Sequence, residues 1–169
     1  MDASELRAAQ APLKQQYRAD PPAARTPVSA RGSFAGTGVT ATIATGAGPV
    51  RAGLHRATGG DGSDVCSGDM LLEAVLACAG VTLRSVATGM GIAIRSADLA
   101  AEGSFDARGT LGIDRAVPVG VTGVTVTATL DTDAGDDQLA RLATMTERYC
   151  VVGRSLAEPP EIVVRRHGG

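Results

Sequence analysis

An apolar segment in the middle of the chain, from about Gly68 to Met90, constrains the fold most strongly. Ser67 before it is a helix-capping residue type, Asp69 suits the first turn, and Gly89 and Gly91 mark its end. We therefore predict a long central helix, apolar and buried on most sides. Its large apolar side chains recur every three or four residues, the spacing of one helix face: Leu72, Leu76, Ala79, Leu83, Val86 and Met90. A second stripe holds smaller groups: Leu71, Ala74, Cys78, Thr82 and Ser85.

The segments on either side are typical of strands, with one further helix. Residues 4–18 have helix-forming composition, but Pro12 predicts a short or broken helix there. A second helix is expected over Leu139–Tyr149 after a capping turn. We predict an α+β fold of mostly antiparallel strands with a long central helix and a second helix. Residues 1–26 would form a helical extension and residues 27–169 a single domain. The expected strands alternate apolar and polar residues or are rich in Val and Ile: Val39–Ala44, Val50–His55, Ile92–Phe105, Val117–Leu130 (with a slip at Gly123) and Ile162–Arg165; Pro27–Phe34 is expected to be extended.

Length and composition exclude several classes of protein. A chain of 169 residues with a net charge of −2 is the size of one domain and has no general attraction for nucleic acid or anionic membranes. Its most apolar stretch, Met70–Leu83, contains Glu73 and is shorter than a membrane span. No signal-peptide pattern occurs in the first twenty residues, so we expect a cytoplasmic protein.

The candidate chemistry rests on three cysteines, Cys66, Cys78 and Cys150. The chain has only two histidines and no Cys-x-x-Cys motif, so it offers few residues for a histidine-based triad or a metal site. We expect neither a metal nor a bound cofactor. Cys78 and Cys150 are either buried core thiols or reactive groups. Arg148 would lower the pKa of Cys150, whereas a helix C-terminus would raise it. Cys66 is a bystander or a site of oxidation.

Two blocks of sequence resemble a known family. Ser67–Arg84, with Leu71-Leu72-Glu73-Ala74, Cys78 and Thr82-Leu83, is similar to the central helix of the OsmC/Ohr superfamily. This superfamily comprises osmotically inducible protein C and the organic hydroperoxide resistance proteins. Glu147–Leu156, with Tyr149-Cys150-Val151 and Ser155-Leu156, resembles the second cysteine motif of the same family.

This resemblance implies an intertwined homodimer that reduces organic hydroperoxides with thiols. Cys78 matches the peroxidatic cysteine and Cys150 the resolving cysteine. Cys78 would become a sulfenic acid, and Cys150 would condense with it to a disulfide. An external dithiol or lipoyl-type reductant would then restore both thiols.

The resemblance also implies charged groups around the thiol. Asp69 lies where the family has a carboxylate, with a first-turn dipole residue as the alternative. Nine residues of helix place Asp69 and Cys78 on opposite faces, roughly 13 Å apart along the axis, so a contact requires the partner subunit or a chain that folds back. The family arginine would be Arg31, Arg51 or Arg56. Glu73 is expected to pair with an arginine, and Thr82 either hydrogen-bonds near the thiol or packs.

Two other interpretations stay open. The chain is then either a redox sensor or small-molecule-binding protein of the same fold, or a structural dimer with inert buried thiols. A depressed pKa and faster reaction of Cys78 than of Cys66 would favour the peroxidase over the sensor or binding protein. The structural dimer predicts slow modification of Cys78 and Cys150 by a thiol reagent until the protein is denatured.

Overall fold

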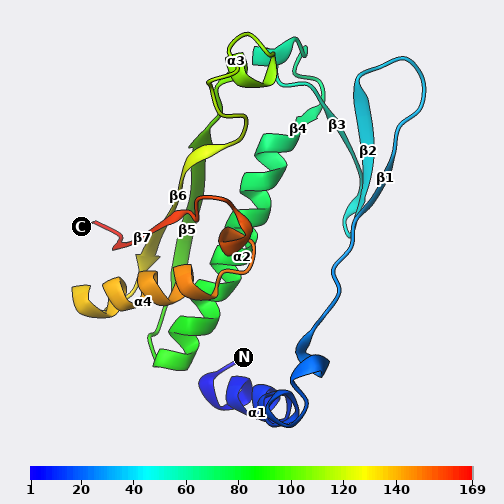
Figure 1. Ribbon diagram of the computed structural model, residues 1–169. Helices are drawn as coiled ribbons and strands as arrows, with labels where there is room; N and C mark the ends of the chain where they lie inside the picture. The colour runs from blue at the N-terminus through cyan, green and yellow to red at the C-terminus, as the bar shows by residue number, and fades with distance from the viewer. Residues whose placement is uncertain (169) are drawn as a thin grey trace.

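The computed structural model describes residues 1–168, which form two sheets, four α-helices and three short 3-10 turns (Figure 1). The α-helices are α1 (Ala3–Ala19), α2 (Ser67–Met90), α3 (Ala107–Thr110) and α4 (Asp136–Tyr149). The first sheet has the order β1 (Arg31–Ser33), β2 (Thr40–Thr45), β3 (Gly48–Gly53) and β4 (Val65–Cys66). The second has the order β5 (Ser96–Ser104), β6 (Thr122–Asp131) and β7 (Glu161–Arg166). The turns are η1 (Pro21–Ala24), η2 (Arg56–Thr58) and η3 (Gly153–Ser155).

The predicted α+β class is confirmed, and both sheets are mixed. β2 pairs antiparallel with β1 and β3, and β6 pairs antiparallel with β5. The two remaining pairs, β3 with β4 and β6 with β7, are parallel. β6 begins at Thr122, later than the predicted Val117. The slip expected at Gly123 appears as a positive φ at that residue and a shift in register against β5 between Glu102 and Ser104.

The core lies between β6, α2 and α4. Alternate residues of β6 are buried, as the period of a half-covered strand requires. One cluster joins the C-terminal half of α2 to α4, and the other joins its N-terminal half to Cys150 and Ile162. At Gly80 the helix approaches β5 so closely that a Cβ would lie 2.8 Å from Leu99 Cδ1.

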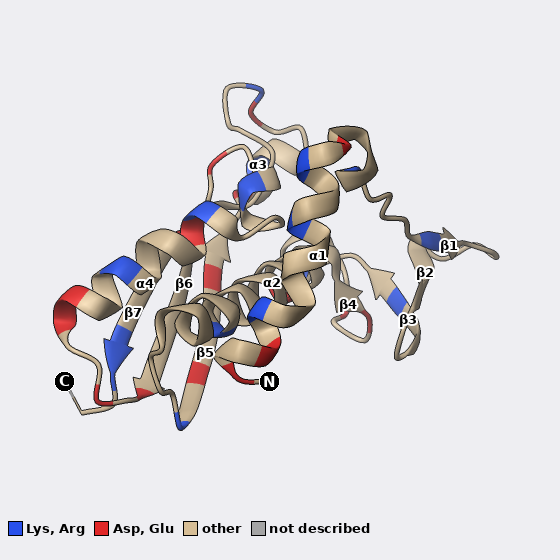
Figure 2. Ribbon diagram, turned by 90° about the horizontal axis from the view of Figure 1, so that it is seen from below, with Lys and Arg blue, Asp and Glu red and all other residues tan. Residues whose placement is uncertain are grey.

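The central helix was predicted correctly in place and length, but not in burial. Only Val75, Ala79, Leu83 and Ala87, four residues apart, are buried, and Val81 is 72% exposed. Cys66, rather than Ser67, caps the helix, since its Sγ accepts a hydrogen bond from the Gly68 N–H at 3.3 Å. Among the described helices, α2 alone has the length and apolar composition of a membrane span, which the core helix of a soluble protein also has. Three of the 24 residues of α2 are charged, Asp69, Glu73 and Arg84. Figure 2 colours the charged residues of the whole chain.

The N-terminal helix contradicts the prediction of a break at Pro12. α1 runs without interruption through Pro12, although proline removes the N–H that would bond to the Ala8 carbonyl. A capping box between Asp2 and Glu5 stabilises its start, and every residue of α1 is at least partly exposed, so water can satisfy the freed carbonyl.

The first 74 residues contribute no buried side chain to the described chain, whose first buried residue is Val75. α1 contacts α2, and a segment without regular structure leads from η1 to β1. In Figure 1 the β1–β3 portion of the first sheet extends away from the α2–α4 body. Strands β1, β2 and β3 are therefore without a core in the single chain.

Candidate active site

Two helices bring Cys78 and Cys150 together from distant parts of the sequence. Cys78 lies midway along α2, and Cys150 is the C-cap residue of α4, where the helix ends. Both belong to the same apolar cluster, with Cys150 1% exposed and Cys78 partly exposed. Each thiol also shifts the pKa of the other: Cys150 lowers that of Cys78, and Cys78 raises that of Cys150.

The turn after α4 supplies backbone donors to both sulfurs. The Val152 N–H donates to Cys78 Sγ at 3.5 Å, and the Gly153 N–H donates to Cys150 Sγ at 3.4 Å. Gly153 is itself buried, and a Cβ there would lie 3.0 Å from Pro160 Cγ and 3.2 Å from Cys150 Sγ. The absence of a side chain at Gly153 therefore lets η3 fold over the thiol pair.

These surroundings make Cys78 the more acidic thiol. Partial burial raises its pKa, but hydrogen bonds from the Val152 amide, Cys150, Thr82 and the Val151 amide outweigh that effect. The pKa of Cys78 therefore lies below the ordinary value of a thiol. Hydrogen bonds that stabilise a thiolate favour nucleophilic chemistry at sulfur.

The pKa of Cys150 is shifted in the opposite direction, above the ordinary value of a thiol. Burial raises its pKa despite the hydrogen bond from the Gly153 amide, and the neighbouring Cys78 raises it further. Its place at the end of α4 agrees in sign, because the negative end of a helix dipole disfavours a thiolate. Arg148 does not offset this, since it is exposed and stacks 5.5 Å over the Tyr149 ring. The site thus pairs a thiol of lowered pKa with a thiol of raised pKa.

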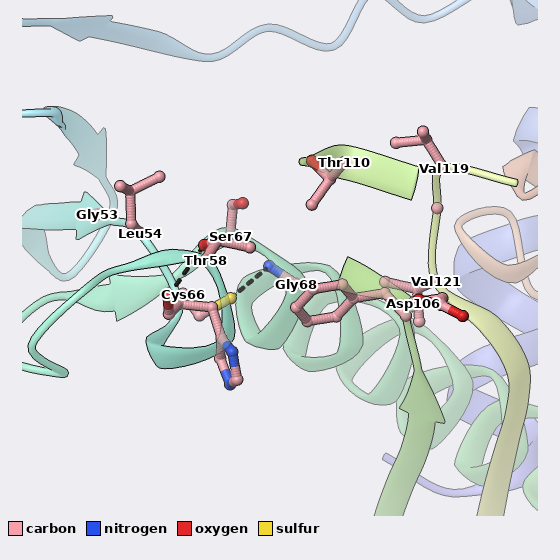
Figure 3. A pocket seen from close by; sticks show the side chains of 13 residues that line it. Gly53, Leu54, Thr58, Cys66, Ser67, Gly68, Asp106, Thr110, Val119 and Val121 are labelled. Atoms are coloured by element: carbon pink, nitrogen blue, oxygen red, sulfur yellow. Dashed lines mark hydrogen bonds between the residues drawn. The ribbon is translucent and has the colours of Figure 1, made fainter. Parts of the chain in front are cut away.

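Asp69 is placed away from this pair. It lies in the first turn of α2 and lines a cavity with Cys66, about 13 Å along the helix from Cys78. An adjoining cavity of about 250 Å³ is lined by Cys66, Phe105 and Val121 among others (Figure 3). The His55 ring meets Phe105 edge to face at 5.3 Å. Within one chain, Asp69 and Cys66 therefore belong to a separate region at the N-terminal end of α2.

The three candidate arginines also lie elsewhere within the single chain. Arg51 on β3 forms an ion pair with Asp64, which raises the pKa of Arg51. Arg31 lies on β1 and Arg56 in η2, both exposed. In residues 1–168, the donors to Cys78 are amides, Thr82 and Cys150, without an arginine. Glu73 is exposed, so it needs no partner to offset burial.

Sequence reasoning named both thiols and Thr82 as candidates but missed the two amides. Backbone donors at Val152 and Gly153 leave no signal in residue types, apart from the glycine itself. No group of three His, Cys, Asp or Glu side chains in the described part of the chain is arranged to hold a metal ion.

One known protein family matches the sequence of this chain. The sequence model of the family described as OsmC-like protein matches residues 60–165, which include α2, α4 and both cysteines of the pair. The chain belongs to the OsmC-like family. No curated protein matches the sequence.

Solved structures share the fold of this OsmC-like protein at low sequence identity. An OsmC-like protein of unknown function from Vibrio cholerae has 14% identity and a TM-score of 0.66, with 84% of this chain and 99% of that chain covered. An organic hydroperoxide resistance protein from Elizabethkingia anophelis has 12% identity and a TM-score of 0.65, with 86% and 99% covered. The organic hydroperoxide resistance protein OsmC from Legionella pneumophila has 14% identity and a TM-score of 0.58, with 84% and 98% covered.

Proposed function

We propose that this OsmC-like protein reduces organic hydroperoxides through Cys78 and Cys150. The observation that carries the proposal is the thiol pair: Cys78 and Cys150 share one apolar cluster beneath the turn after α4, whose amides donate to both sulfurs. The pKa of Cys78 is lowered and that of Cys150 is raised. Family relatives described as organic hydroperoxide resistance proteins support the same chemistry.

The reaction proceeds in two steps at sulfur. The Cys78 thiolate attacks the distal oxygen of the peroxide, the O–O bond breaks, and the alkoxide leaves as an alcohol after gaining a proton. Cys78 is then a sulfenic acid. Cys150 loses its proton and attacks the Cys78 sulfur, an S–S bond forms, and the S–O bond breaks to release water. An external dithiol, of which the lipoyl type is our candidate, exchanges with the disulfide and restores both thiols.

We further propose that the working form is a homodimer. The single chain exposes 11411 Å², whereas a compact monomer of 17.0 kDa is expected to expose about 7700 Å². The excess of about 3700 Å² per chain is more than enough for the area that each subunit buries in an obligate dimer. It is concentrated in the N-terminal residues that lack a core and in the exposed side of α2.

Peroxide consumption by matched variants tests the enzymatic proposal. Wild type, Cys78→Ser, Cys150→Ser and Cys66→Ser would each be mixed with cumene hydroperoxide or hydrogen peroxide and reduced dihydrolipoamide. We expect rapid consumption of cumene hydroperoxide by wild type and Cys66→Ser, and none above background in Cys78→Ser. Equal background rates in wild type and Cys78→Ser would refute the peroxidase.

A redox sensor is the second candidate, favoured by the positions of Asp69 and the arginines. Without a charged group at Cys78, the pair would form a disulfide slowly in response to oxidants. Slow oxidation of wild type, with little turnover, would support this alternative. Asp69→Glu then tests whether a longer carboxylate restores the rate.

A further inference from the structure

Thr146 carries a buried hydroxyl without a partner next to the thiol pair. Its side chain is 0% exposed, and among residues 1–168 its Oγ1 is the one buried side-chain oxygen or nitrogen found without a hydrogen bond. Buried polar groups are nearly always paired, so an exception calls for a functional explanation.

The position of Thr146 relates it to Cys150. The Cys150 N–H donates to the Thr146 carbonyl at 2.9 Å, so the two residues lie one turn apart on the same buried face of α4. This face packs against α2, the helix that carries Cys78. Side chains four positions apart along a helix have Cβ atoms about 5–6 Å apart, so a change of rotamer at Cys150 brings its sulfur to the Thr146 hydroxyl. In the resting structure that sulfur faces the Gly153 N–H at 3.4 Å.

Other helical threonines in this chain behave differently. Thr144 donates to the Ala140 carbonyl at 3.1 Å, and Thr88 donates to the Arg84 carbonyl at 2.8 Å. These are the usual bonds of a helical threonine to the residue four positions before it. The Thr146 hydroxyl makes no such bond, although it is the most deeply buried of the three. It is free to donate elsewhere.

We infer that the Thr146 hydroxyl is a donor held ready for the sulfur of Cys150 when that sulfur becomes an anion. The inference rests on the proposed function, because it concerns the step in which Cys150 attacks Cys78. In that step the Cys150 S–H proton leaves, the S–S bond forms, and the group on Cys78 departs. Thr146 acts on Cys150 as a positioning residue. In the resting thiol state its hydroxyl has no acceptor.

The surroundings of Cys150 offer little other stabilisation of a thiolate. Its side chain lies among apolar residues of α2, β6 and β7, and Cys78 is the titratable group that acts on it. The nearest charged side chains along the chain are all exposed: Glu147, Arg148, Arg154 and Glu158. Beyond the amides of η3, a donated hydroxyl is therefore the available means of stabilising the anion.

The test measures the attack by Cys150 without any peroxide. In a Cys66→Ser background, reduced protein is mixed with 5,5′-dithiobis(2-nitrobenzoate). Cys78 attacks the reagent's disulfide and releases one aromatic thiolate, and Cys150 then attacks the mixed disulfide on Cys78 and releases a second. A Cys150→Ser variant should show only the first phase and so identifies the two phases.

Three threonine variants separate the hydroxyl from packing. Thr146→Val removes the hydroxyl at nearly constant volume, Thr146→Ser keeps it, and Thr144→Val removes an exposed hydroxyl from the same helix. We expect Thr146→Val to slow the second phase about fivefold to tenfold at neutral pH and to move its pH midpoint upward. The first phase should not change. Thr146→Ser should retain most of the rate, and Thr144→Val all of it.

Two results would overturn the inference: an unchanged second phase in Thr146→Val, or equal slowing in Thr146→Ser and Thr146→Val. Absence of a second phase in the Cys66→Ser background would also reject it, because Cys150 would then not attack Cys78. Failure to consume peroxide, with the threonine effects as expected, would reject only the peroxidase. Thermal unfolding of each variant confirms that the compared proteins are folded.

Discussion

The two cysteines of the pair, Cys78 and Cys150, lie in different local environments. The amides of Val151 and Val152 lower the pKa of Cys78, as do Thr82 and Cys150, while burial at the end of α4 raises the pKa of Cys150. Opposite pKa shifts suit the two steps of the proposed reaction. Cys78, the more acidic thiol, attacks the peroxide first, and Cys150 attacks the oxidised sulfur of Cys78 afterwards.

The lowered pKa of Cys78 predicts its pH dependence. Only the thiolate reacts, so a pKa below the ordinary value moves the rise in rate to lower pH than for a free thiol. We expect alkylation of Cys78 by iodoacetamide, followed by mass spectrometry, to reach half its maximum below about pH 8.5. A midpoint at or above that of an unstructured cysteine peptide would contradict the assignment.

Folding stability should depend on pH through both thiols, with opposite signs. Because the pKa of Cys78 is lower in the folded than in the unfolded chain, its contribution is present above the unfolded pKa and lost as pH falls through the folded pKa. The raised pKa of Cys150 acts oppositely: its contribution is present below the unfolded pKa and lost as pH rises through the folded pKa. Urea unfolding of Cys78→Ser and Cys150→Ser across this range should separate the two contributions.

Gly153→Ala should disturb the packing around the thiol pair while both cysteines are kept. The new Cβ would crowd Pro160 Cγ at 3.0 Å and Cys150 Sγ at 3.2 Å. We expect a loss of about 1–3 kcal/mol in stability, as for other overpacked sites, and slower disulfide formation. Gly135→Ala, where a Cβ meets nothing within 4 Å, is the matched control. Unchanged disulfide kinetics in Gly153→Ala would show that η3 can shift freely.

At the scale of elements, α1 shows how context overrides a local rule. Pro12 predicts a break, yet the helix continues because its partly exposed surface lets water satisfy the carbonyl that proline leaves free. Conversely, α2, α4 and β7 follow their periodic patterns closely, and only their ends differ from the predicted ranges.

Pro12→Ala should strengthen α1. It restores one hydrogen bond and removes the ring from the helix interior, so the helix should gain up to about 3 kcal/mol. Hydrogen exchange of the α1 amides measures this directly, and greater protection is expected around Ala8–Pro12. Ala11→Pro provides the opposite control, with reduced protection. Equal exchange in wild type and Pro12→Ala would indicate that proline costs this helix nothing.

At the scale of the molecule, the exposed apolar side of α2 needs a covering surface. Val81 is 72% exposed, and it lines an apolar depression with Leu76 and Leu99. An exposed apolar patch on a helix that also lies in the core is typical of an interface.

Val81→Asp should therefore weaken the proposed dimer. A charge buried at the interface would be expected to lower association at least a hundredfold. Ile113→Asp, at a loop residue 71% exposed, is the matched control and should leave association intact. Analytical ultracentrifugation over a concentration series distinguishes them. A wild-type protein that stays monomeric throughout would reject the dimer, and equal behaviour of the two variants would reject this interface.

The sequence by itself determined the α+β class, the long central helix, the second helix and the two cysteines of the pair. These follow from periodicity and motifs within one segment, which nearby residues set alone. Tertiary structure decided what depends on distant segments: the approach of α4 to α2, the amides of Val152 and Gly153 over the sulfurs, and the solitary hydroxyl of Thr146. It also decided which side of α2 is covered, because burial depends on what packs against a helix as well as on its own residues.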